Sequence, residues 1–179
     1  METKRNHPAL QTKSSVSTIN PLSPVFKKSI LKANFSDVVK TILNDKPPTI
    51  YRSYKDNEEK AIDILILMLI QFQDFYNCKR VMDKEQLTEI AYMISEEYRH
   101  LNYIDLAFCL KRVKAKEKIF DRIDGGLIMG WLRDYDKERT SKILQERQKQ
   151  KTKEDSEWSG LGDRSSLISL KQYMRKEDN

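Results

Sequence analysis

The clearest hydrophobic pattern in the chain follows Asp83. Five apolar residues lie at positions i, i+3, i+4, i+7 and i+11, and so on one face of a helix: Leu87, Ile90, Ala91, Ile94 and Tyr98. Asp83 and Gln86, three residues apart, have the spacing of a capping box. The pattern therefore predicts an amphipathic helix that starts at Asp83.

A second segment is apolar nearly all round. Asn57 can cap a helix whose next residues, Glu58 and Glu59, oppose the positive end of the helix dipole. Residues 62–75 are mostly Ile, Leu, Met and Phe. The segment contains no turn signal, and its length favours a helix over a buried strand. Because an apolar helix must be covered, we expect other helices around it.

Three further helices complete the predicted core. Asn102 with Asp105 can start one of them. Asp124 can start the last core helix, which we expect to run out into solvent as its apolar side dwindles. Residues 35–44 can form a short helix capped by Ser36.

Together these elements predict an all-α fold, a compact bundle of four to five helices over residues 36–150. Hydrophobic residues make up 39% of the chain and charged residues 34%, with 5 Gly and 5 Pro, a composition that suits long helices better than a β-sandwich. The flanks read as a disordered basic arm at residues 1–35 and a flexible tail at residues 151–179. Within the tail, residues 165–174 have the pattern of a short amphipathic helix.

The net charge of +6 lies in the flanks. Residues 1–35 carry +5 and residues 136–153 carry +4, whereas residues 36–135 carry −1 and residues 154–179 carry −2. This distribution suits weak, salt-sensitive contact with nucleic acid or an acidic partner. A solvated basic tail is the more common explanation for charge of this size.

The sequence contains no recognisable constellation for catalysis. Its two histidines, His7 and His100, lie in the polar start and at a predicted helix end, so no nucleophile triad can be assembled. Cys78 and Cys109 form no CxxC pair and give no zinc ligand set. No phosphate-binding loop motif occurs. We therefore expect a protein that is not an enzyme and that has no cofactor and no metal.

The most apolar run, residues 61–70, contains Asp63 and is about half the roughly 20 residues that a membrane-spanning helix needs. No secretory signal follows the polar start of the chain. From these observations we expect a cytoplasmic protein with no membrane partner.

One basic segment is a candidate for nucleic-acid binding. We expect residues 111–122 to form a connector between two helices. It holds six cations, interleaved with apolar residues: Lys111, Arg112, Lys114, Lys116, Lys118 and Arg122. They are typical of a surface that holds a phosphate backbone, and a solvated turn would look the same.

Two groups are candidates for binding a protein partner. Trp131, Tyr135 and Arg139 repeat with helical spacing after Asp124, although an aromatic pair on an apolar stripe is more often part of a core. The tail offers a second group, which can dock on a partner as one amphipathic turn: Leu167, Leu170 and Tyr173.

Residues 75–139 resemble a group of small uncharacterised helical proteins encoded by phages and mobile elements of gut bacteria. The resemblance rests on DRIDG at Asp121 to Gly125 and on WLRDYDKER at Trp131 to Arg139, a DRIDG…WLxxYDxER pattern. Just before DRIDG the family carries glycines, whereas Ala115 to Phe120 reads AKEKIF. The resemblance implies mobile-element biology, with a role in DNA replication or its regulation, and no particular activity.

Two functions from different classes fit these observations. The first is a non-catalytic accessory protein of DNA replication that contacts DNA or RNA, a replication partner, or both. The second is a protein interaction module, such as a virion component or an inhibitor of a host protein, without nucleic-acid binding. Binding that weakens steeply with salt favours the first function, and salt-insensitive binding to one protein favours the second.

Overall fold

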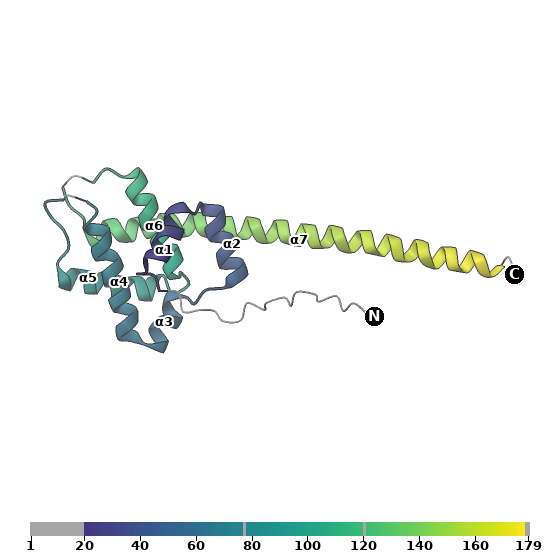
Figure 1. Ribbon diagram of the computed structural model, residues 1–179, viewed down its shortest axis with the longest axis horizontal. Helices are drawn as coiled ribbons and strands as arrows, with labels where there is room; N and C mark the ends of the chain where they lie inside the picture. The colour runs from purple at the N-terminus through teal and green to yellow at the C-terminus, as the bar shows by residue number, and fades with distance from the viewer. Residues whose placement is uncertain (1–19, 77, 120, 178–179) are drawn as a thin grey trace, which may run out of the picture. The chain divides into compact units, whose positions relative to one another are not determined.

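The protein is mostly helical. The computed structural model describes residues 20–76, 78–119 and 121–177, and for residue 154 and residues 157–177 it describes the backbone alone. Within these ranges there are seven helices and no strand (Figure 1). They are α1 (Pro24–Lys32), α2 (Phe35–Asp45), α3 (Ile50–Asp56), α4 (Glu58–Gln73), α5 (Lys84–Glu97), α6 (Tyr103–Lys116) and α7 (Gly125–Glu177). The predicted helical class is confirmed, and the predicted number of four to five helices is wrong.

Local capping chemistry fixes where several helices begin. Asn57 caps α4, accepting a hydrogen bond from the Lys60 amide at 2.9 Å. Asp83 with Gln86, and Asn102 with Asp105, close the predicted capping boxes of α5 and α6. These three starts are confirmed.

The predicted cap of α2 is wrong. Asn34, not Ser36, is the N-cap residue, and it forms a capping box with Asp37. Ser36 lies inside the helix. The two candidates are two residues apart and both are favourable cap residues, so composition alone does not separate them.

Two helices went unpredicted. Helix α1 lies inside the segment expected to be disordered, with Ser23 as its cap and Pro24 as its first residue. Proline suits the first position of a helix, because the amide hydrogen that it lacks has no partner there anyway. Helix α3 is only seven residues long and starts at the fully buried Ile50. Both helices are too short for a visible period.

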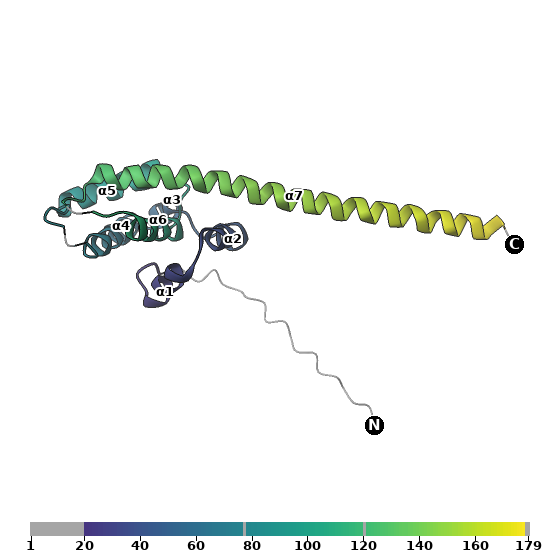
Figure 2. The ribbon, with the colours of Figure 1, turned by 90° about the horizontal axis from the view of Figure 1, so that it is seen from above.

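The chain divides into two units, Met1–Gly125 and Gly126–Asn179. In the first unit α4 packs against α3 and α5, while α1 and α2 pack against α6 (Figure 2). Leu65, Leu69 and Phe72 of α4 are almost completely buried, as expected for its apolar sequence. Its neighbours do not cover it entirely, since Leu67 is 43% exposed.

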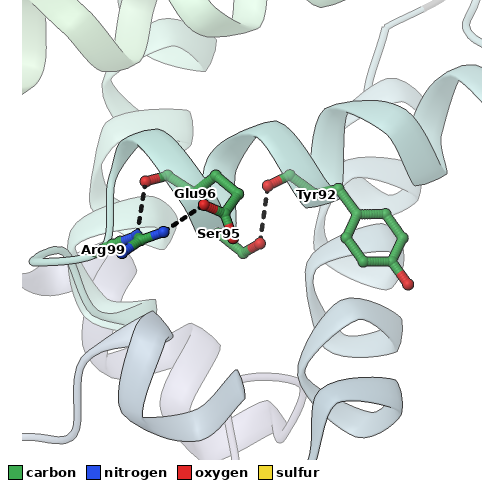
Figure 3. A network of polar contacts seen from close by, with 4 residues as sticks. All are labelled: Tyr92, Ser95, Glu96 and Arg99. Atoms are coloured by element: carbon green, nitrogen blue, oxygen red, sulfur yellow. Dashed lines mark hydrogen bonds and ion pairs between the residues drawn. The ribbon is translucent and has the colours of Figure 1, made fainter. Parts of the chain in front are cut away.

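Polar contacts tie the last turns of α5 together at its C-terminal end (Figure 3). Arg99 reaches back to the carboxylate and the backbone carbonyl of Glu96, and Ser95 donates to the carbonyl of Tyr92 (Figure 3). The Arg99 guanidinium also lies over the ring of Tyr51 in α3, 5.0 Å from its centroid. Of these contacts, the one between Arg99 and Tyr51 links the end of α5 to α3.

The second unit consists of most of one helix, α7. Its first part contains a stripe of buried residues: Ile128, Met129, Leu132, Tyr135 and Arg139. The helical backbone continues to Glu177, through residues 151–177, where we predicted a flexible tail. In the part of the chain that the structure describes, no helix has the length and apolar character to cross a membrane.

Candidate nucleic-acid interface

Lys111 and Arg112, predicted to lie in a connector, lie in α6 and hold the first unit together. Helix α6 continues to Lys116, so the predicted connector bounds are wrong. The Lys111 ammonium donates a hydrogen bond to the carbonyl of Ala33, between α1 and α2, at 2.6 Å. Arg112 lies 5.3 Å from the centroid of the Phe35 ring. Both cations therefore fasten α6 to the α1–α2 segment, which leaves them poorly placed to hold a ligand.

Lys114 is also a structural cation. Its ammonium donates to the carbonyl of Gln71, in the last turn of α4, at 3.3 Å, and lies 4.7 Å from the centroid of the Phe75 ring. A cation at this place satisfies a carbonyl that the helix leaves unpaired and opposes the helix dipole. Burial lowers the pKa of Lys114, the charge of Lys27 adds to this effect, and Asp74 opposes it.

The true connector between α6 and α7 is fastened to the loop between α4 and α5. Arg80 and Arg122 form a parallel backbone bridge. The amide of Arg80 donates to the carbonyl of Asp121 at 3.2 Å, and the amide of Ile123 donates to the carbonyl of Arg80 at 3.0 Å. This bridge brings together two segments that are distant in the sequence.

Five exposed cations lie in or directly beside the two bridged segments, and we call them the two-loop patch: Lys79, Arg80, Lys116, Lys118 and Arg122. The acidic residues of the two segments are Asp74, Asp83, Glu117, Asp121 and Asp124. Arg122 forms an ion pair with Asp124, with Nε and Oδ2 3.0 Å apart. The other four cations form no ion pair with any residue that the structure describes.

Lys79 and Arg80 were missed in the sequence because they lie far from the basic segment. Three predicted residues, Lys116, Lys118 and Arg122, remain in the patch, whereas the other three support the fold. The sequence carried one available signal, the KR pair after Cys78. Nothing local connects that pair to Arg122.

Two of the predicted partner-binding residues are not exposed. Tyr135 is 3% exposed and Arg139 is 7% exposed, so neither presents a surface to a partner. Trp131 is half-buried. The side chains of Leu167, Leu170 and Tyr173 lie outside the described residues.

Among the described residues, no group of three or more His, Cys, Asp or Glu side chains is arranged to hold a metal ion. Cys78 and Cys109 form no disulfide in the described part of the chain, and Cys109 is buried. The chemistry that this surface supports is electrostatic contact with anions. No protein-family model, no curated protein and no solved structure matches the chain.

Proposed function

We propose that the protein is a non-catalytic accessory protein of a phage or mobile element, associated with DNA replication, and that it contacts nucleic acid through the two-loop patch. The observation that carries the proposal is the bridge that places Arg80 beside Arg122. Like charges on directly opposed residues disfavour such a pairing unless something offsets their repulsion. The ion pair between Arg122 and Asp124 offsets part of the repulsion between the two arginines.

In this proposal, a bound phosphate backbone supplies the further negative charge that offsets the repulsion between Arg80 and Arg122. Lys79, Arg80, Lys116 and Lys118 are exposed and without ion pairs among the described residues, so they can exchange counterions for phosphates without breaking the fold. The patch carries arginine, whose planar group holds phosphate oxygens in pairs.

The link to replication rests on the resemblance of residues 75–139 to proteins of phages and mobile elements. All five residues of the patch lie inside that stretch, and one of them, Arg122, lies in the DRIDG motif. A replication partner would then add specificity that the patch lacks.

The proposal is tested by fluorescence anisotropy of labelled single-stranded and double-stranded DNA and RNA at about 50 mM salt, where several phosphate contacts give measurable binding. The patch variant combines Lys79→Gln, Arg80→Gln, Lys116→Gln and Lys118→Gln. The matched control loses the same charge from exposed helix positions elsewhere, through Lys28→Gln, Lys40→Gln, Lys84→Gln and Lys137→Gln.

We expect the patch variant to bind at least about tenfold more weakly than the control, since four phosphate contacts are removed from one place. Equal affinities of the two variants would show that only total charge matters and would refute the patch. Absence of binding by the natural chain at this salt concentration would refute the nucleic-acid function.

The second candidate, a protein interaction module, is favoured by the length of α7. Its backbone is helical through residues 165–174, where Leu167, Leu170 and Tyr173 are spaced three residues apart. Helical spacing in a segment expected to be flexible suits docking on a partner groove. Salt-insensitive capture of one protein by the natural chain, lost in a chain ending at residue 160, would support this function instead.

A further inference from the structure

A cavity of about 490 Å³ lies in the first unit, between the loop that joins α2 to α3 and the starts of α4 and α6. Its size falls within the range of roughly 300–1,000 Å³ typical of small-molecule sites. Its floor is apolar and includes Pro47, Ala61 and Ile104, all of them buried. The cavity lies outside the two-loop patch and shares none of its residues.

The walls of the cavity are held by backbone contacts. Thr49 and Asn102 form an antiparallel bridge, and the amide of Ile50 donates to the carbonyl of Leu101 at 2.7 Å. The cap groups of α3 and α6 complete this junction. The cavity is therefore formed before any ligand arrives, which lowers the entropic cost of binding.

Three cations lie at the rim of this cavity, one from each wall segment: Lys46, Arg52 and Lys60. All three are exposed, and none forms an ion pair with a residue that the structure describes. One carboxylate, Asp56, lies among them. The rim therefore has a formal net charge of +2, from three positive groups and one negative group.

Lys46 occupies a conformation that lysine rarely adopts. It follows α2 with φ 45° and ψ 56°, in the left-handed region, and is the one residue with positive φ among those described. Glycine or asparagine usually takes this place at the end of a helix. A lysine kept in a strained position at the rim of a cavity is a sign of a functional side chain.

Tyr103 adds an unused polar group to the wall. The residue is 6% exposed, and its hydroxyl has no hydrogen-bond partner in the described part of the chain. Ser53 lies close enough to influence the pKa of Tyr103, but the two hydroxyls do not have hydrogen-bond geometry. Buried hydroxyls are normally satisfied, so a polar group or water held in the cavity is the expected partner.

We propose that this cavity binds a small phosphorylated molecule, with the phosphate held by Lys46, Arg52 and Lys60 and an apolar or aromatic body resting on the floor. A phosphomonoester carries about −1.5 to −2 charges at pH 7, which complements the rim. The rim alone would suit any anion, whereas the apolar floor selects one that has an organic body.

The test is isothermal titration calorimetry with adenosine 5′-monophosphate, adenosine and inorganic phosphate, using the full chain. We expect the monophosphate to bind more tightly than either fragment. In the double variant Arg52→Gln, Lys60→Gln the monophosphate should bind at least tenfold more weakly. The control Lys40→Gln, Lys84→Gln, which loses the same charge outside the cavity, should bind like the natural chain.

Lys46→Gly separates a binding role from a structural one. Glycine relieves the backbone strain at this position, so the midpoint of thermal unfolding should rise, while the affinity for the monophosphate should fall. Unchanged affinity in both cavity variants would overturn the proposal, and so would absence of binding at millimolar monophosphate. Inorganic phosphate binding as tightly as the monophosphate would overturn the role of the apolar floor.

Discussion

The side chain of Gln73 and the backbone of Met82 exchange two hydrogen bonds. The Met82 amide donates to Gln73 Oε1 at 2.9 Å, and Gln73 Nε2 donates to the Met82 carbonyl at 3.3 Å. Both residues are buried. This pair closes the loop between α4 and α5, and that loop carries Lys79 and Arg80 of the two-loop patch.

Gln73→Leu should therefore destabilise the protein. Leucine leaves the amide and the carbonyl of Met82 buried without partners, which costs about 3 kcal/mol in the free energy of unfolding. Urea denaturation of this variant and of Gln145→Leu, at an exposed position of α7, measures the difference. An equally small effect of both substitutions would contradict the structural role of the pair.

Steric crowding explains why a glycine stands at the end of the DRIDG motif. A Cβ atom at Gly125 would lie 2.2 Å from Cδ1 and 2.7 Å from Cγ1 of Ile90. Gly125→Ala should thus cost about 2 kcal/mol through overpacking. In the double variant with Ile90→Ala the loss should be smaller than the sum of the single losses, because the clash is gone.

Gly130 is the matched control for Gly125. A Cβ atom there would meet nothing within 4 Å. Because alanine is the better helix former, Gly130→Ala should stabilise the protein by about 0.5–1 kcal/mol. Thermal unfolding of the two alanine variants should shift in opposite directions, and shifts in the same direction would contradict this account.

Lys114 should behave unlike its basic neighbours. Since Lys114 closes the end of α4, Lys114→Ala should lower the free energy of unfolding by about 1 kcal/mol. Lys116→Ala and Lys118→Ala should each change it by less than about 0.5 kcal/mol. Chemical denaturation of the three single variants decides this.

Tyr103 should make stability fall at alkaline pH. Burial raises its pKa above the ordinary 10.0, and the Ser53 hydroxyl opposes the rise. The folded chain therefore holds the proton more tightly than the unfolded chain, so stability is lost as pH rises above about 10. Tyr103→Phe should reduce that loss, and near pH 7 it should cost little because the hydroxyl has no partner. Unfolding curves at pH 7 and 10.5 measure both effects.

Helix starts were predictable where the signal was local. Asn57, Asp83 and Asn102 cap helices because their side chains reach amides within three residues, which the sequence displays directly. The roles of the cations were not predictable. Lys111 and Lys114 looked like Lys116 and Lys118 in the sequence, and only tertiary contacts with Ala33 and Gln71 separate the two pairs.

The basic patch required the same kind of long-range information. Backbone hydrogen bonds between two irregular segments bring Arg80 and Arg122 together. Neither segment has a periodic sequence pattern from which this pairing could be predicted. The cavity at the α2–α3 loop depends likewise on the meeting of Thr49 with Asn102. Sites of this kind form only when the fold brings together residues that carry no distinctive pattern in the sequence.

The salt dependence of nucleic-acid binding tests the central claim most directly. Each phosphate contact to duplex DNA contributes a slope of about −0.9 to log K against log salt. The patch variant, with Lys79, Arg80, Lys116 and Lys118 replaced by Gln, should show a slope shallower than that of the natural chain by about 2 or more, while the matched control keeps the natural slope. Identical slopes for the two variants would contradict the claim that the two-loop patch holds the phosphate backbone.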